Sequence, residues 1–195
     1  MTNVTLSGRQ HPLLVLVGGA PASGKTTLAT LLAESLGLPV LSKDLIKERL
    51  LDDLGAPDLA RSRELGAASY GVLYAVVARL LDAGASVIVE SNFSRGRAEG
   101  ELRPLTARAG SVLVHCETTS VEIVRRYTAR ADRGERHPGH LDAAVLPDLL
   151  RNLATDVYEP LNLDVPTIRV DTTAGYAPSF AEIVAFAADS TGPLR

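Results

Sequence analysis

Apolar segments and helical segments alternate along the chain. Five short apolar runs show no regular alternation with polar residues, and they cover residues 13–17, 38–41, 87–89, 112–114 and 167–170. Such runs are typical of parallel strands whose two faces are both covered by helices. Patterns typical of helices separate and follow them, over residues 25–36, 44–54, 61–83, 97–109, 121–133, 142–157 and 179–188. This order predicts an α/β three-layer sandwich with a parallel sheet and right-handed crossovers.

Glycines and one loop mark the ends of the predicted elements. Gly37, Gly84 and Gly110 each stand between a predicted helix and the next strand, where a left-handed residue often ends a helix. The sequence GERHPGHL, residues 134–141, interrupts the pattern between two helices and predicts a mobile loop. Because no internal repeat or low-complexity linker divides the chain, we expect one domain over residues 1–195.

The composition is that of an ordinary globular protein, with 46% hydrophobic and 22% charged residues. The net charge of −3 gives no general attraction to nucleic acid or to an anionic membrane, so any polyanion site must be local. The single cysteine, Cys116, excludes an intrachain disulfide and a thiolate metal cluster. The longest apolar runs are far shorter than the roughly 20 residues of a membrane-spanning helix, and no signal peptide is evident. We therefore expect a cytoplasmic protein without a membrane partner.

The basic residues are unevenly divided between the two types. Of 20 basic residues only three are lysines, namely Lys25, Lys43 and Lys47, and the others are arginines. A chain that uses arginine for nearly every positive charge makes the positions that keep lysine candidates for a specific role.

A phosphate-binding motif follows the first predicted strand and opens the first predicted helix. Residues 19–26 read GAPASGKT and match G-x-x-x-x-G-K-[ST], a pattern that few sequences of this composition would contain by chance. Its glycines let successive backbone N–H groups point at a phosphate, Lys25 reaches the β- and γ-phosphates, and Thr26 is the expected Mg²⁺ ligand. The predicted nucleotide-binding residues are Gly19, Ala22, Ser23, Gly24, Lys25, Thr26 and Thr27. The motif predicts binding of Mg²⁺ with ATP, with GTP as the alternative.

Three motifs together resemble those of a known family. They are GAPASGKTT at residues 19–27, Asp44 just after the second strand, and ESNF at the end of the third. The chain resembles the P-loop kinases of the AAA-type ATP-binding group that includes phage-type polynucleotide 5′-kinases, zeta toxins and chloramphenicol phosphotransferases. The resemblance implies a five-stranded sheet in the order 2-3-1-4-5. It also implies a helical lid over the phosphates, at approximately residues 125–141.

The resemblance also implies an acceptor site. It makes Asp44 the general base on the acceptor hydroxyl, and it places Lys47 where relatives usually carry an arginine. The alternative is that Asp44 only caps the helix that follows it. Glu90 and Asn92 end the third strand, where ligands bind in open α/β sheets, and both are predicted to bind substrate. The alternative for this pair is a polar strand end that meets solvent.

An arginine-rich stretch precedes the predicted loop. Arg126, Arg130 and Arg133 share one helix face, and the apolar residues on another face, including Val121, are expected to pack on the sheet. As lid arginines, Arg130 and Arg133 are the predicted catalytic residues that meet charge on the transferred phosphoryl group. The alternative is a solvated face in which Glu122 pairs with Arg126. His137 and His140 are interpreted as turn residues or lid contacts, since further zinc ligands are not evident.

These residues predict an ATP-dependent phosphotransferase that moves the γ-phosphate to a hydroxyl of a small molecule, either a metabolite or an antibiotic. One alternative is a 5′-hydroxyl polynucleotide kinase, which the net charge and Lys47 disfavour without excluding nucleic acid as a partner. A third hypothesis is a P-loop ATPase or switch without a phosphoryl acceptor.

Overall fold

A computed structural model of the protein describes residues 11–189, so the domain expected over 1–195 reaches beyond the described residues at both ends. Five parallel strands form one sheet in the order β2-β3-β1-β4-β5. The strands are β1 (Leu13–Gly19), β2 (Val40–Ser42), β3 (Val87–Glu90), β4 (Gly110–Glu117) and β5 (Thr167–Asp171). Both the α/β class and the strand order 2-3-1-4-5 are confirmed.

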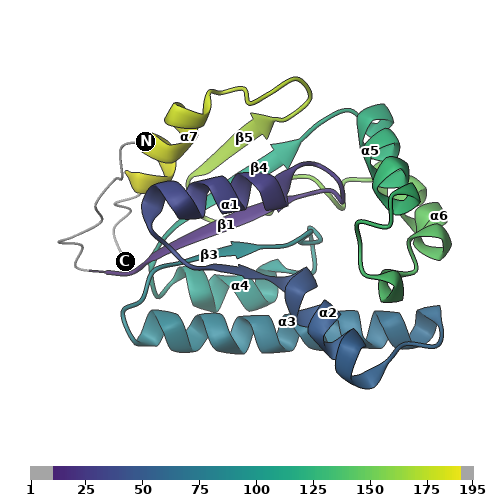
Figure 1. Ribbon diagram of the computed structural model, residues 1–195. Helices are drawn as coiled ribbons and strands as arrows, with labels where there is room; N and C mark the ends of the chain where they lie inside the picture. Colours follow the sequence, from purple (N-terminus) through teal and green to yellow (C-terminus); the bar gives the residue numbers. More distant parts are fainter. Residues whose placement is uncertain (1–10, 190–195) are drawn as a thin grey trace.

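Helices cover both faces of the sheet. They are α1 (Lys25–Leu36), α2 (Lys43–Leu54), α3 (Leu59–Asp82), α4 (Glu99–Thr106), α5 (Ser120–Asp132), the short 3-10 helix η1 (Pro138–His140), α6 (Asp142–Leu153) and α7 (Phe180–Ala188). Figure 1 shows α1 and α7 on one face and α3 and α4 on the other. The elements α5, η1 and α6 lie beyond the carboxyl ends of the strands, and we call residues 120–153 the cap segment.

The central strand shows why the apolar runs do not alternate with polar residues. Every residue of β1 is buried. Leu13, Val15 and Val17 pack in the core with α1 and α7, whereas Leu14 and Leu16 pack with α3 and α4. Because each side chain faces one of two helical layers, both sets must be apolar, and each buried Leu contributes about 1.5–3 kcal/mol to folding.

The ends of some elements differ from those predicted. Gly37 and Gly84 are left-handed, as expected, with φ of 66° and 76°. The prediction for Gly110 is wrong, because Ala107 closes α4 and Gly110 already pairs with Leu13 as the first residue of β4. Helix α6 ends at Leu153, four residues before the predicted end, where the chain turns.

Helix α3 is long and apolar enough, by length and composition, to cross a membrane, and it is the one such helix among the described residues. Its Leu73, Val77 and Leu81 are buried in the core beneath the sheet. Packing in the core accounts for these three side chains, whereas Val72 and Val76 of the same helix are exposed. Charged residues of the helix, including Arg79, keep its apolar runs short, so run length alone predicted no span.

The cap segment packs on itself and on the phosphate loop. Its small core contains Ile123, Tyr127 and Leu149 with Ala20 of the loop. The expectation that Val121 packs on the sheet is wrong, since this side chain is 80% exposed. Which side of α5 is buried depends on its contact with α6. The sequence of α5 alone does not show that contact.

Candidate active site

The phosphate loop joins β1 to α1 and needs glycine for its shape. Gly19 has a φ of 137°, and a Cβ added there would lie 2.2 Å from the backbone oxygen of Cys116. Ala22 and Gly24 are also left-handed, with φ of 63° and 86°. Gly24 precedes α1 and offers no side-chain cap. The first N–H groups of α1 therefore keep the capacity to bind an anion.

Two polar side chains line this loop without a strong partner. Ser23 is fully buried, and its hydroxyl has no hydrogen-bond partner among the described residues. Lys25 Nζ donates a 3.3 Å hydrogen bond to the carbonyl of Ala20 and lies 3.8 Å from Glu90 Oε1. A buried orphan hydroxyl and a nearly buried ammonium fit a loop built to receive a phosphate.

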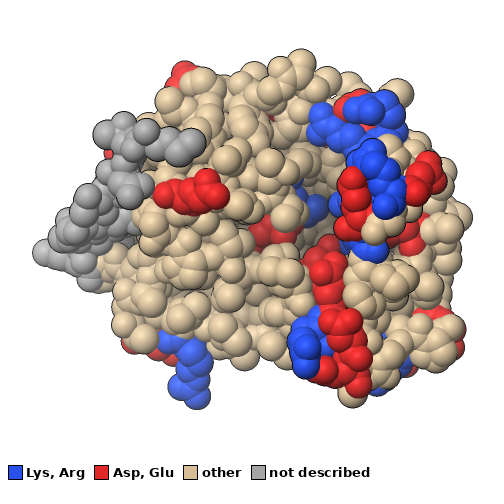
Figure 2. Space-filling model, in the orientation of Figure 1, with Lys and Arg blue, Asp and Glu red and all other residues tan. Residues whose placement is uncertain are grey.

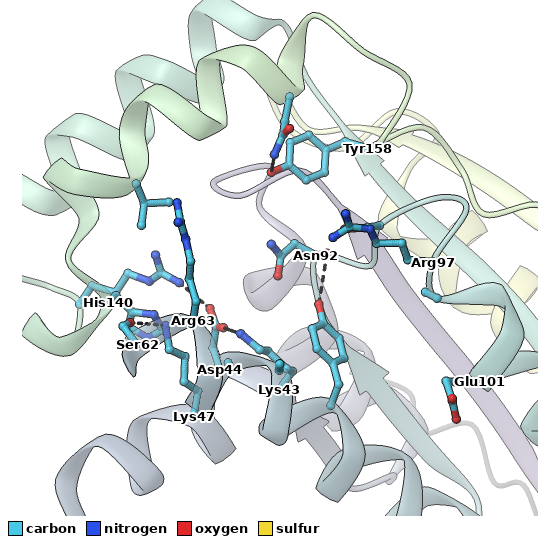
Figure 3. A pocket seen from close by; sticks show the side chains of 18 of the residues that line it. Lys43, Asp44, Lys47, Ser62, Arg63, Asn92, Arg97, Glu101, His140 and Tyr158 are labelled. Carbon is cyan, nitrogen blue, oxygen red and sulfur yellow. Dashed lines mark hydrogen bonds and ion pairs between the residues drawn. The ribbon is translucent and has the colours of Figure 1, made fainter. Parts of the chain in front are cut away.

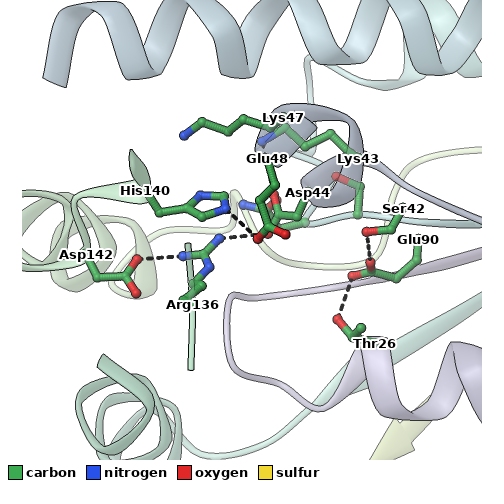
Figure 4. Close-up of polar contacts among 12 residues, drawn as sticks. Thr26, Ser42, Lys43, Asp44, Lys47, Glu48, Glu90, Arg136, His140 and Asp142 are labelled. Atoms are coloured by element: carbon green, nitrogen blue, oxygen red, sulfur yellow. Dashed lines mark hydrogen bonds and ion pairs between the residues drawn. The ribbon is translucent and has the colours of Figure 1, made fainter. Parts of the chain in front are cut away.

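Glu90 connects the ends of three strands to the loop. The register of the sheet sets it beside Val17 of β1 and Ser42 of β2. Thr26 Oγ1 donates to its Oε1 at 3.2 Å, and Ser42 Oγ donates to its Oε2 at 2.7 Å (Figure 4). The threonine hydroxyl with a carboxylate behind it is a donor set that fits Mg²⁺.

No cluster of three or more His, Cys, Asp or Glu that could hold a metal occurs within residues 11–189. This agrees with Mg²⁺ chemistry, because that ion usually takes one or two protein ligands and completes its shell with phosphate oxygens and water. His137 and His140 belong to no such cluster in the described part of the chain.

Asp44 lies in the first turn of α2 but does not cap it. The N-cap residue is Ser42. Arg136 Nη2 is 2.7 Å from Asp44 Oδ2, and Lys43 Nζ is 3.2 Å from Oδ1 (Figure 4). Burial alone would raise the pKa of Asp44, but Lys43 and Arg136 outweigh it and hold the pKa well below the ordinary value of 3.8. Asp44 is therefore ionised at neutral pH.

Lys47 lies one turn further along α2. It is 7% exposed, and its Nζ donates a 2.9 Å hydrogen bond to Ser62 Oγ of α3. Burial and the nearby charge of Lys43 lower the pKa of Lys47 to about 8.

A cavity of about 540 Å³ lies beside Asp44. Its walls come from α2, α3, the connection from β3 to α4, and the cap segment (Figure 3). Asn92 lines it together with Tyr70, whose hydroxyl donates to the Asn92 carbonyl at 3.3 Å. Glu90 is not among its lining residues and faces the phosphate loop instead. Of the four residues predicted to bind substrate, Asp44, Lys47 and Asn92 thus share one cavity.

The lid arginines do not form one group. Arg130 has a buried Nε that lacks a hydrogen-bond partner in the described residues, and its guanidinium lies 5.7 Å from the ring centre of Tyr127. Arg133 is exposed and pairs with Glu135. Arg126 pairs with Glu122 at 2.6 Å, as the alternative interpretation predicts, and also binds the carbonyl of Thr172 at 2.8 Å. Arg130 is the one of these three that keeps an unused buried donor.

One residue of the site, Arg136, was not singled out by the sequence reasoning, and another, His140, was interpreted only as a turn residue or a lid contact. Arg136 bridges Asp44 and Asp142, at 2.7 Å from each. His140 is 4% exposed, and its Nε2 lies 2.9 Å from Glu48 Oε1. Burial, with the nearby charge of Arg136, lowers the pKa of His140 to about 3. The segment predicted to be a mobile loop therefore carries a 3-10 helix that contacts α2. In the sequence, the basic residues around its Pro-Gly pair were the feature that could have indicated a role in the site.

Charged side chains gather where the molecule is hollowed. Figure 2 shows basic and acidic groups around the depression at the carboxyl end of the sheet, over the cap segment and α2. The remainder of that face carries few charges. The uneven distribution is consistent with a local anion site in a chain of net charge −3.

Comparison with known proteins identifies the group to which these features belong. The profile of the family described as an AAA domain matches residues 14–155. A candidate kinase from Chloroflexus aurantiacus is 36% identical, with a TM-score of 0.83 over 94% of this chain and 100% of that one. The APS kinase CysC of Mycobacterium tuberculosis, solved with AMPPNP and APS, is 22% identical, with a TM-score of 0.55 over 91% of this chain and 98% of that one.

Longer relatives also contain this unit. An uncharacterised protein of Mycobacterium tuberculosis is 32% identical over an alignment of 141 residues that covers 68% of this chain. The chain spans 28% of that relative's length.

Proposed function

Because the chain belongs to the AAA domain family and has the fold of P-loop kinases, we propose that it is an ATP-dependent kinase that phosphorylates a hydroxyl group of a small molecule. The observation that carries this proposal is the cavity of about 540 Å³ with the Asp44 carboxylate on its wall, since Asp44 is close enough to Lys25 of the phosphate loop for that charge to help lower its pKa. A phosphoryl transferase needs a second site next to the γ-phosphate, whereas a P-loop switch without an acceptor does not. The volume suits a small metabolite.

The phosphate loop would hold the triphosphate of ATP, with GTP as the alternative. Backbone N–H groups at the start of α1, the Ser23 hydroxyl and Lys25 would bind its oxygens. Thr26, with Glu90 behind it, is the side chain that would hold Mg²⁺, which when bound neutralises charge on the β- and γ-phosphates. Arg130 would give its unused Nε donor to the transferred group as charge develops there.

Asp44 would receive the acceptor hydroxyl. An ionised carboxylate has about four lone-pair sites, so the contacts with Arg136 and Lys43 leave room for one more donor. A carboxylate with so low a pKa is a weak base, but phosphoryl transfer passes through a loose transition state in which orientation matters more than basicity. Asp44 would therefore align the hydroxyl and take its proton as the new P–O bond forms.

A 5′-hydroxyl polynucleotide is the alternative acceptor. Arg136 and His140 of the cap segment both contact α2 and close that side of the cavity. A chain of nucleotides needs an open groove with several phosphate contacts. The closed side favours a small acceptor, in the cytoplasmic setting expected from the composition.

The proposal is tested by transfer of labelled γ-phosphate from ATP to a panel of polyols, sugars, hydroxy acids, nucleosides and 5′-hydroxyl oligonucleotides. We expect labelling of a small acceptor, its loss in Lys25→Ala, and near-normal activity in Arg79→Gln, which removes an exposed cation of α3 far from the loop. ATP hydrolysis that no acceptor stimulates would contradict a kinase. Preferential labelling of the oligonucleotide would select the alternative.

A further inference from the structure

Two of the three lysines in the chain are not explained by the phosphate loop. Lys25 belongs to that loop, whereas Lys43 and Lys47 stand one turn apart on α2. Both line the cavity beside Asp44 (Figure 3). They are 8% and 7% exposed, so two like charges are held close together and largely away from solvent. Such an arrangement costs free energy unless an opposite charge compensates it.

The protein itself supplies little of that compensation. Lys43 Nζ shares the Asp44 carboxylate with Arg136, at 3.2 Å and 2.7 Å. Lys47 pairs with no carboxylate among the described residues, and its hydrogen-bond acceptor is the neutral hydroxyl of Ser62. That hydroxyl in turn donates to the carbonyl of Gly139 at 2.7 Å. No ion pair therefore compensates the Lys47 charge, which Asp44 and Asp142 attract only from a distance.

The rest of the cavity adds positive charge. Arg97 extends toward it from the connection between β3 and α4, and no ion pair holds its guanidinium in the described structure (Figure 3). The cavity also contains Glu101, which lies on the opposite side from Lys47 (Figure 3). Among the residues that line the cavity at the end that holds Asp44, cations therefore outnumber acids, and Asp142 outside the lining pairs with Arg136.

A purely structural role would not require this charge. The hydrogen bond to Ser62 needs only an N–H donor, which a neutral amide also supplies, so it does not by itself explain a buried ammonium group. A buried lysine without a carboxylate partner, in a chain otherwise rich in arginine, indicates that the charge itself is used.

We propose that the phosphoryl acceptor is a compact hydroxylated molecule that carries an anionic group, either a carboxylate or a phosphate, and that Lys47 binds this group. The inference rests on the proposed function, since it names the acceptor class of the same site. Positions three apart on a helix face the same side, about 5–6 Å apart. An anionic group at Lys47 therefore leaves a hydroxyl only a few bonds away within reach of Asp44. Cationic aminoglycosides do not fit such a site.

Matched acceptors that differ only in charge test the proposal. The pairs are glycerate with glycerol, gluconate with glucitol, and glucose 6-phosphate with glucose, each assayed for transfer of labelled γ-phosphate. We expect the anionic member of at least one pair to have kcat/KM at least about tenfold above that of its neutral partner, the worth of one hydrogen bond to a charged group. The carboxylate and phosphate pairs distinguish the two sources of negative charge.

Variants at position 47 assign the preference to one residue. Lys47→Gln should lower the ratio of anionic to neutral kcat/KM by about tenfold or more, while Lys47→Arg should keep most of it. Arg61→Gln removes an exposed cation of the same helix bundle outside the cavity and should leave the ratio unchanged. Melting curves confirm that each variant is folded. If a variant is not folded, the ratio of anionic to neutral kcat/KM in the wild type still tests the proposal.

The outcomes separate this inference from the proposed function. Transfer to neutral acceptors with equal or greater kcat/KM in every pair, or a ratio unchanged in Lys47→Gln, would overturn the anionic acceptor and leave the kinase intact. Absence of transfer to any acceptor in the wider panel would overturn the kinase itself.

Discussion

Asp44 lies between two cations, and this position decides what it can do. Lys43 and Arg136 keep its carboxylate ionised, so that it accepts hydrogen bonds at neutral pH. The same contacts reduce its affinity for a proton. The residue is thus better suited to orient a hydroxyl than to store its proton, and the contact with Arg136 links it to the cap segment.

Replacing the carboxylate with an amide tests this role. Asp44→Asn should lower kcat by about 10²–10⁴, the usual effect of losing a general base, and leave nucleotide affinity within a few-fold. Because Ser42 is the N-cap of α2, the change removes no helix cap. Asp53→Asn, which alters an exposed acid on the same helix, should leave kcat near the wild-type value. An unchanged kcat with a lower melting temperature would make Asp44 a structural residue.

Arg130 and Arg133 are expected to behave differently although they are close in sequence. Arg130→Gln should lower kcat by about 10²–10³, with little change in nucleotide affinity, because its buried donor would act on charge that develops during transfer. Arg133→Gln is the matched control, since this side chain is exposed and paired with Glu135. Steady-state kinetics with both variants decide the assignment. A large loss of kcat in Arg133→Gln would show that the cap segment rearranges around the substrate.

Sequence could predict residues whose position follows from a local motif. The spacing of Gly19, Gly24 and Lys25 was enough to predict the shape of the loop, because the strand, the turn and the helix follow one another directly in the chain. The contacts of Arg136 and His140 could not be predicted, because their partners on α2 are 92 residues away in the chain. Only the fold brings those segments together.

At the scale of helices and strands, the predicted ends match the observed ends where neighbouring residues in the chain determine them. Helix α1 begins and ends at the predicted residues, since Gly24 and Gly37 bound it by their own backbone preference. Strand β4 is longer than its apolar run, because its first residue Gly110 is recruited by pairing with Leu13 of β1. Local composition therefore predicted the first element well, and pairing across the sheet decided the second.

Helix α7 carries a capping box that should contribute measurably to stability. Ser179 Oγ accepts from the amide of Glu182, and the Glu182 carboxylate accepts from the amide of Ser179 at 2.8 Å. Ser179→Ala should lower the free energy of unfolding by about 0.5–2 kcal/mol. Urea unfolding measures the loss, and kcat should not change because α7 lies on the sheet face, away from the cavity.

A matched serine tests the capping explanation. Ser120 is the first residue of α5, where Thr119 is the N-cap. Ser120→Ala should therefore change the free energy of unfolding by less than Ser179→Ala. Equal losses in both variants would mean that the capping box contributes nothing particular to α7.

At the scale of the whole molecule, the candidate site is assembled from three regions. The phosphate loop, the start of α2 and the cap segment meet at the carboxyl edge of one sheet, which is where open α/β sheets bind ligands (Figure 1). Overall composition could not reveal the charge that gathers at this site. A net charge of −3 averages over a surface whose charges are unevenly placed. The strand order, by contrast, followed from the resemblance, since the motifs fix which strands flank the loop.

Burial of His140 between the cap segment and α2 makes global stability depend on pH. Its pKa is lowered to about 3 in the folded protein, first by burial and then by Arg136. Below the ordinary value of 6.5 the unfolded chain binds a proton that the folded protein does not, so stability present above that pH is lost as the pH falls. Burial also lowers the pKa of His115, which adds to the loss in the same direction.

The His140 contribution is isolated by comparison with His140→Gln. Between about pH 7.5 and pH 5.5 the wild type should lose about 1.4 kcal/mol more unfolding free energy than the variant, from the protonation of one unfolded histidine. The pKa of Glu48, which contacts His140, is raised by burial, and its effect on stability has the opposite sign. Urea unfolding at each pH supplies the values, and the comparison uses slopes, so a uniform loss of stability in the variant does not matter. Equal losses in both proteins would mean that His140 is protonated, or freed from α2, in the folded state.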